Sequence, residues 1–331
     1  MLFLLDCGSY GQTSVVTPES AALQGPALIL ASSRALNDND LRRIQKLGNS
    51  EKREQFAQAG RFGLGINSMY HLSDTPQIFA DGVALVVLDP LHRLSGADGR
   101  RFSPEQLEQK FPDMLKPFAA VAEGYPTVFR LPLRASGSAF GKGWSVDGAK
   151  ALVSRFVESQ AQEMLLFAKS VSRVTFCVRT SSGATQPLCM ISRADTVVDR
   201  ERASPRKSPR RVKAVASAAS AATPPAHPPP VQEGLASPFM LQLPTSLEEV
   251  KQLQQAPRDA IERVTIVVEA YGLAPLETQW LIAHSLAVDD DGLKLITDAL
   301  TGSTPTALLP HGAVALLLSP TTGEYKGNVA A

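Results

Sequence analysis

Three glycines in a six-residue stretch, Gly60, Gly63 and Gly65, are the residues whose type and spacing best suit chemistry. Glycine tolerates positive φ and lets the backbone approach a ligand closely, and the amides that open a following helix form an anion site. Residues 66–71 follow directly and are compatible with a helix, so the stretch suits the phosphates of a nucleoside triphosphate. Ordinary turns share this spacing, and spacing alone leaves both interpretations open.

This glycine stretch differs from the two best-known phosphate loops. It lacks the Gly-Lys-Ser/Thr ending of a P-loop, and the preceding residues 51–59 read as a helix, whereas a dinucleotide fingerprint follows a strand. Other constellations are weaker. Asp89, His92 and Asp98 lack metal-ligand spacing and fit a surface loop, and no Gly-x-Ser-x-Gly elbow marks a nucleophile. The sequence therefore assigns no catalytic residue and no metal ligand.

Short apolar runs separated by polar and glycine-rich segments predict an α/β fold. Such runs predict strands at residues 2–5, 27–31, 83–88, 127–133, 171–178, 187–191, 264–269, 280–286 and 312–318. Helical spacing of apolar residues predicts helices at residues 37–47, 51–59, 146–169, 246–255 and 292–300. The longest of these helices has an apolar face, and we expect it to pack on the core.

The order of these elements predicts two folded units and one insertion. Residues 1–134 form a first sandwich, residues 135–194 open a second, smaller α/β unit with a helix and a hairpin, and residues 239–320 complete that unit. Residues 195–238 are rich in Ser, Ala, Pro and basic residues, and they cannot bury enough apolar surface to order themselves. We therefore expect a disordered insertion there and a frayed tail at 321–331.

Charge and cysteine content limit the class of protein. Thirty-three Lys and Arg residues balance 32 Asp and Glu residues, so the net charge of +1 creates no general field for nucleic acid or anionic membrane. Three cysteines without metal spacing favour a reducing compartment. The apolar start is too short for a signal peptide, and no run of about 18 apolar residues occurs. We expect a cytoplasmic protein that binds neither nucleic acid nor membrane.

A longer pattern around the glycines resembles the sacsin repeat, which belongs with gyrase, histidine kinases and the ninety-kilodalton heat-shock chaperone to the GHKL, or Bergerat-fold, superfamily. The pattern runs Gly60-Arg-Phe-Gly-Leu-Gly-Ile-Asn-Ser-Met-Tyr-His-Leu-Ser-Asp-Thr-Pro76, and a strand ending in Leu88-Asp-Pro90 follows. Similar segments occur in the family's order at Gly25-Pro-Ala-Leu28, Phe111-Pro-Asp113 and Thr127-Val-Phe-Arg-Leu-Pro-Leu-Arg134. The resemblance covers roughly residues 1–193, is strongest over 60–134 and resumes faintly from about residue 262.

This resemblance implies a two-layer α/β sandwich, in which a mixed sheet carries helices on one face and ATP with magnesium lies between the helices and a lid. The residues that match the family's binding motif are Gly60, Arg61, Phe62, Gly63, Gly65 and Thr127. By this match the glycines would cradle the phosphates, the phenylalanine would pack the lid and the threonine would reach toward adenine. The arginine would either add charge to the phosphates or remain a solvated lid residue.

Two departures from the family pattern concern the nucleotide site. Family members carry, before the strand equivalent to residues 2–5, a helix whose Glu activates water and whose Asn holds magnesium. Met1 lies after that position, so we expect an N-terminally truncated member that does not hydrolyse ATP. The family's adenine-binding Asp aligns with Ser33, whose hydroxyl supplies only part of that role. A start further upstream would restore the helix and an active ATPase.

Two functional hypotheses follow from the resemblance. The first is a sacsin-like chaperone or co-chaperone module with a degenerate ATP-binding site, which acts with the seventy-kilodalton heat-shock chaperone or with client proteins. The second is a catalytically dead protein-interaction module that binds no nucleotide. The glycine pattern favours the first hypothesis, whereas the missing Glu and Asn and the serine at position 33 favour the second.

Overall fold

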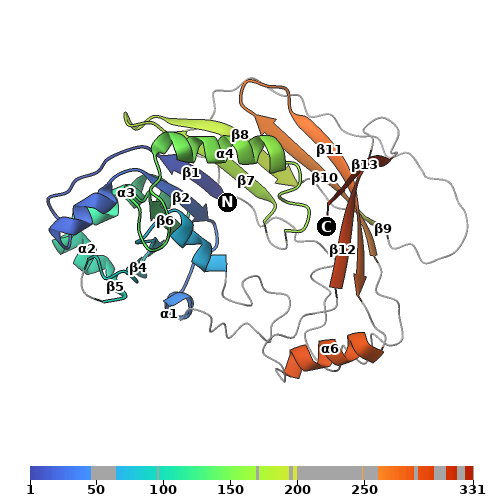
Figure 1. Ribbon diagram of the computed structural model, residues 1–331, viewed down its shortest axis with the longest axis horizontal. Helices are drawn as coiled ribbons and strands as arrows, with labels where there is room; N and C mark the ends of the chain where they lie inside the picture. Colours follow the sequence, from blue (N-terminus) through green and yellow to red (C-terminus); the bar gives the residue numbers. More distant parts are fainter. Residues whose placement is uncertain are drawn as a thin grey trace, which may run out of the picture.

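The computed structural model in Figure 1 describes residues 1–45, 65–94, 97–168, 171–193, 197–199, 248, 260–286, 290–301, 311–318 and 325–330. Its strands are β1 (Leu2–Asp6), β2 (Ala27–Ser32), β3 (Gln77–Ala80), β4 (Ala84–Leu88), β5 (Gly99–Phe102), β6 (Thr127–Pro132), β7 (Arg173–Arg179), β8 (Thr185–Arg193), β9 (Val197–Asp199), β10 (Ala260–Ala270), β11 (Leu276–Leu286), β12 (His311–Leu318) and β13 (Tyr325–Ala330). Its helices are η1 (Pro18–Gln24), α1 (Asp38–Gln45), η3 (Gly65–His71), α2 (Pro104–Lys110), α3 (Pro112–Ala122), α4 (Val146–Gln160) and α6 (Asp290–Thr301).

One mixed sheet contains all of these strands. Its order is β13-β12-β11-β10-β8-β7-β1-β2-β6-β3-β4-β5, and β9 pairs with β10. The β1–β7 pair is parallel, and the other described pairs are antiparallel. The predicted α/β class with a mixed sheet is confirmed. The same sheet runs through both predicted units, because β1 of the first unit pairs directly with β7 of the second.

Helices cover both faces of the sheet. Alternate residues of β1 show this arrangement: Leu2 and Leu4 join a core packed under α2 and α3, whereas Phe3 points to the other face. That other face carries α1 and η3 over β3, β4 and β6, and the α4 segment over β7, β8 and β10. Figure 1 shows α4 lying across β7 and β8, and α6 beyond the ends of β11 and β12. The one-sided arrangement implied by the family resemblance is thus extended by helices on the second face.

The helix predicted over residues 146–169 is shorter in the structure. α4 ends at Gln160, and turns follow it through residue 167. Two consecutive leucines in these turns, Leu165 and Leu166, are both 1% exposed, whereas neighbours in a straight helix point about 100° apart. Arg193 Nη1 donates to the carbonyls of both leucines, at 3.4 and 3.3 Å, and so replaces the hydrogen bonds that a continued helix would supply.

Two segments predicted to lack structure contain strands. In the expected frayed tail, Tyr325–Ala330 forms β13, which pairs with β12 from Leu318 to Ala315. In the expected insertion, Val197–Asp199 forms β9 against β10, and residues 200–238 lie outside the described residues. A strand at a sheet edge can be held by backbone hydrogen bonds without an alternating apolar pattern. The apolar pattern used to predict strands therefore gave no signal for β9 or β13. No helix within the described residues is long and apolar enough to cross a membrane.

The parallel β1–β7 pair joins the two halves of the sheet. Phe3 stacks on Phe176 across the pair, with ring centroids 5.0 Å apart. At the carboxyl ends of the two strands, Arg179 Nη1 lies 3.6 Å from Asp6 Oδ2 and donates to Tyr10 Oη at 3.1 Å. The Tyr10 hydroxyl donates to Asp6 Oδ2 at 2.5 Å. Burial and the neighbouring Asp6 raise the pKa of Tyr10, so the phenol stays protonated and keeps this hydrogen bond at neutral pH.

A buried arginine fixes the end of η3. Arg134, whose side chain is 1% exposed, donates from Nε to Asp74 Oδ1 at 2.6 Å, and its other nitrogens donate to the carbonyls of Tyr70, His71 and Lys142. The fork of the guanidinium therefore joins η3 to the chain that leads into α4. A second arginine, Arg93, approaches the same carboxylate from a half-exposed position, with Nη1 3.0 Å from Oδ2.

A carboxylate at the start of α3 holds the loop after β1. Asp113 Oδ2 accepts from Thr13 N, Thr13 Oγ1 and Ser14 N at 2.9–3.0 Å, and its Oδ1 lies 2.6 Å from Lys116 Nζ. The ion pair with Lys116 and the hydrogen bonds from Ser14 and Thr13 hold the pKa of Asp113 well below its ordinary value. The loop also needs glycine at position 11, because a Cβ there would lie 2.3 Å from Asp113 Oδ1.

We expect Arg134→Lys to lower the free energy of unfolding by about 2–4 kcal/mol, because one ammonium cannot replace a fork that serves Asp74 and three carbonyls in a buried site. Arg93→Lys is the matched control on the same carboxylate. Its side chain is 46% exposed, so we expect a change of at most about 1 kcal/mol. Urea titration followed by circular dichroism measures both, and equal effects would contradict the structural role given to Arg134.

Asp113 should make stability depend on pH. A carboxyl whose pKa is depressed in the folded state stabilises the fold fully above its unfolded pKa of about 4, and this contribution falls away as the pH drops further. We expect the stability difference between the unmodified chain and Asp113→Asn to be constant from pH 7 to about pH 5 and to shrink below about pH 4. Urea titrations measure this difference, and Asp147→Asn, at a carboxyl that is 96% exposed, is the control for the removal of one negative charge.

Candidate functional site

Ser33 and Thr127 lie together at one end of the sheet. β2 and β6 are antiparallel with Ser32 opposite Thr127, so the residue after β2 lies beside the first residue of β6. Thr127 is 1% exposed, and its hydroxyl donates to the carbonyl oxygen of Arg34 at 2.7 Å. Ser33 is exposed. The two residues expected at adenine therefore share one location, where one hydroxyl is already engaged with the backbone and the other faces outward.

The glycine stretch is described only at its end. Gly60, Arg61, Phe62 and Gly63 lie outside the described residues, and Gly65 is the first residue of η3. Residues 66–71 were compatible with a helix from their sequence, and the structure has a 3₁₀-helix there. The following residues Ile66 and Met69 pack in the cluster that also contains Leu131 of β6 and Leu41 of α1.

The candidate site extends along β6. Thr127 begins this strand beside Ser33, and Arg134, two residues after its end, holds the last turn of η3. Six residues of strand separate these two regions by roughly 17–20 Å at 3.3–3.4 Å per residue. Both regions are associated with the sheet face that carries α1 and η3. An elongated ligand lying along β6 would meet the hydroxyls of Ser33 and Thr127 at one end. It would meet the segment after the glycines at the other end.

Adenine could meet hydroxyl acceptors at the Ser33 end. The amino group of adenine is a donor, and a hydroxyl oxygen keeps acceptor capacity even when its proton is used elsewhere. Thr127 Oγ1 therefore keeps acceptor lone pairs while it donates to Arg34. Both groups are neutral, whereas the aspartate found in the family would be charged, so hydrogen bonding to the base would be weaker here. The acceptor capacity at this end of the sheet is therefore that of two neutral hydroxyls, of which the Thr127 hydroxyl belongs to a residue that is 1% exposed.

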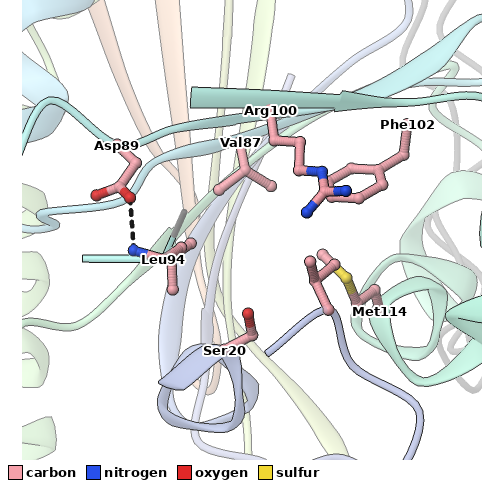
Figure 2. A pocket seen from close by; sticks show the side chains of 8 residues that line it. Ser20, Val87, Asp89, Leu94, Arg100, Phe102 and Met114 are labelled. Atoms are coloured by element: carbon pink, nitrogen blue, oxygen red, sulfur yellow. Dashed lines mark hydrogen bonds between the residues drawn. The ribbon is translucent and has the colours of Figure 1, made fainter. Parts of the chain in front are cut away.

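A small hollow on the opposite face is too small for a ligand. Figure 2 shows Arg100 lying over the ring of Phe102, with Asp89 turned to the backbone of Leu94. The hollow has a volume of about 10 Å³, which is room for about one water molecule. Asp89 is 1% exposed and accepts from the amides of Arg93 and Leu94 at 2.9 and 2.7 Å. This carboxylate therefore stabilises its own loop.

The acidic and histidine residues of this loop do not gather around a common point. His92 Nε2 lies 2.8 Å from Asp98 Oδ1, and both side chains are exposed. Within the described residues, no group of three His, Cys, Asp or Glu side chains could hold a metal ion. The ion pairs of Arg134 with Asp74 and of Arg179 with Asp6 were not recognised from sequence, because 60 and 173 positions separate the partners and no local pattern links them.

Comparison with known proteins agrees with the resemblance to the sacsin repeat. Residues 1–190, which include Ser33, Thr127 and the strands β1–β7, match the sacsin domain. Human sacsin is 29% identical over 212 residues, a match that covers 59% of this chain and 4% of sacsin. The chain thus spans a small part of this relative's length. Since the domain match extends over more than half of the 331 residues, the chain belongs to the sacsin domain family.

Proposed function

We propose that this chain is a sacsin-like chaperone or co-chaperone module that acts in protein folding or quality control and has a degenerate ATP-binding site. The observation that carries the proposal is the convergence of Ser33 and Thr127 at one end of β6, on the strand whose other end is tied to the segment after the glycines. In this proposal the site follows the GHKL arrangement, and adenine lies at Ser33 while the phosphates lie at the glycine stretch.

The proposed roles follow the family motif. Gly60, Gly63 and Gly65 would offer backbone amides to the phosphates, Arg61 would add positive charge, and Phe62 would pack the lid. ATP would bring magnesium to the phosphates. We assign no described residue to the metal or to water activation, and we expect binding without hydrolysis. The partners that suit such a module are the seventy-kilodalton heat-shock chaperone and client proteins, and the expected compartment is the cytoplasm.

One observation favours a second candidate function, that of a protein-interaction module without nucleotide. The Thr127 hydroxyl is buried and already donates to Arg34, and position 33 has no carboxylate. A site that has lost its charged adenine acceptor can keep its fold, since the core residues of the sheet do not depend on position 33. Titration of ATP with magnesium into the purified chain separates the two functions, because the second predicts no saturation at millimolar nucleotide.

Restoring the acidic residue should strengthen recognition of the base. We expect Ser33→Asp to tighten ATP binding about tenfold, equivalent to about 1.4 kcal/mol, because a carboxylate accepts more strongly from the adenine amino group. GTP, which has an acceptor oxygen at that position, should not bind more tightly. Calorimetry with both nucleotides measures the change. Ser136→Asp, at an exposed loop position, is the control for added charge, and an equal gain there would contradict the proposed pose.

The glycine stretch can be tested separately from the base. We expect Gly63→Val to weaken ATP binding at least tenfold, because a branched side chain keeps the backbone amides from approaching the phosphates closely. Gly137→Val is the matched control: position 137 is exposed, and a Cβ there would have its nearest neighbour at 3.8 Å. Calorimetry gives the affinities and urea titration the stabilities. Unchanged affinity of the Gly63 variant would contradict the proposal that this loop binds the phosphates.

A further inference from the structure

A cavity of about 300 Å³ lies at the turn between β3 and β4, on the face covered by α2 and α3. Its apolar lining includes Phe79 from β3, Leu107 from α2, and Leu115 and Phe118 from α3. Phe79 stacks on Phe118 with ring centroids 5.2 Å apart, which places an aromatic surface inside it. The cavity is distinct from the candidate nucleotide site, because Phe79 and Phe118 belong to the core on the opposite face of the sheet from Met69.

Regular local structure forms the walls of this cavity. Gly82, at φ +64°, makes the tight turn between β3 and β4, and a Cβ there would meet nothing within 4 Å. Ser103 and Gln106 form a reciprocal capping box that fixes the start of α2. Alanines such as Ala119 and Ala122 complete the wall on α3, and their small side chains leave the space between the helix and the hairpin unfilled. The cavity therefore exists in the folded chain without any rearrangement.

The charges at the cavity have one sign. Two of its lining residues carry charge, Asp81 at the β3–β4 turn and Glu108 on α2, and both are exposed carboxylates. An apolar interior with a negative rim complements a large apolar group beside a positive one. It opposes phosphate-bearing ligands such as nucleic acid and anionic lipid headgroups. The volume is at the lower limit for ligand pockets, so it suits one large side chain better than a bulky cofactor.

We infer that this cavity is a docking site for a protein segment in which a large aromatic or aliphatic side chain lies next to Lys or Arg. The large side chain enters between Phe79 and Leu115, and the basic residue lies at Asp81 and Glu108. Aromatic side chains bury the most area per residue and are frequent anchors in interfaces, which makes tryptophan the strongest occupant. The inference does not rest on nucleotide binding, because Phe79, Leu115 and the two carboxylates are not residues of the candidate nucleotide site.

Fluorescence anisotropy with labelled pentapeptides tests the inference on the full chain. The probe is fluorescein-labelled Gly-Arg-Trp-Lys-Gly, compared with Gly-Glu-Trp-Glu-Gly and Gly-Arg-Ser-Lys-Gly. We expect saturable binding of the first peptide and at least tenfold weaker binding of the other two, with an affinity that falls as salt rises. Failure of the first peptide to saturate at millimolar concentration, or equal binding of the basic and acidic tryptophan peptides, would overturn the inference.

Two variants locate the binding in the cavity. Ala119→Trp, at an exposed lining position on α3, fills the space and should weaken binding at least tenfold. Glu108→Lys should weaken the basic peptide about fivefold and strengthen the acidic one, whereas Glu105→Lys, on the same helix but outside the lining, should change either by less than twofold. If circular dichroism shows that the Ala119 variant misfolds, the Glu108 and Glu105 pair decides alone. Equal effects at these two positions would overturn the assignment.

Discussion

The parallel pairing of β1 with β7 is the constraint on which the rest of this structure depends. β1 lies between β2 and β7 and pairs with both of them. It therefore connects β2, which Ser33 follows, and β6, which begins at Thr127, with the long antiparallel hairpins of the second half. A parallel pair cannot be closed by a tight turn, and here the chain from Cys7 to Ser172 forms the connection. Five β1 residues pair with β7, and the ionic contact of Asp6 with Arg179 lies at the end of the pair. The sheet is continuous because this one pairing holds.

A second constraint is the burial of positive charge on β6 and just after it. Arg130 is fully buried, donates to the carbonyls of Leu23 and Gly25, and also contacts Gln77. Burial lowers the pKa of Arg130 to about 10, which still leaves it charged at neutral pH. Together with Arg134, this arginine joins the sheet to η1 and η3 through backbone carbonyls. A buried guanidinium that donates to particular carbonyls specifies which loops lie against the strand. Apolar packing is not directional and does not specify this.

The sequence predicted the strands that carry continuous apolar runs and missed those that do not. Residues 2–5, 27–31 and 83–88 are such runs, and β1, β2 and β4 lie there. β5, which ends the strand order of the described residues, contains two consecutive arginines and no apolar alternation, so it gave no signal. For the candidate site, family resemblance predicted Ser33 and Thr127, and the structure places these two residues side by side. The engagement of the Thr127 hydroxyl with Arg34 could not, because it depends on how two strands end side by side.

β3 is only four residues long, and its side chains contact both faces of the sheet. Ile78 and Ala80 face the cluster shared with η3, Phe79 faces the cavity under α3, and Ala80 pairs with Thr127. Phe79 and Ala80 are joined by one peptide bond, so the cavity wall and the pairing of Ala80 with Thr127 share the same backbone. If both proposed ligands bind, this backbone is common to the two binding equilibria, and any change that one ligand makes in the affinity of the other must be matched by an equal change in return. Such coupling between the two faces would require neither a hinge nor a second subunit.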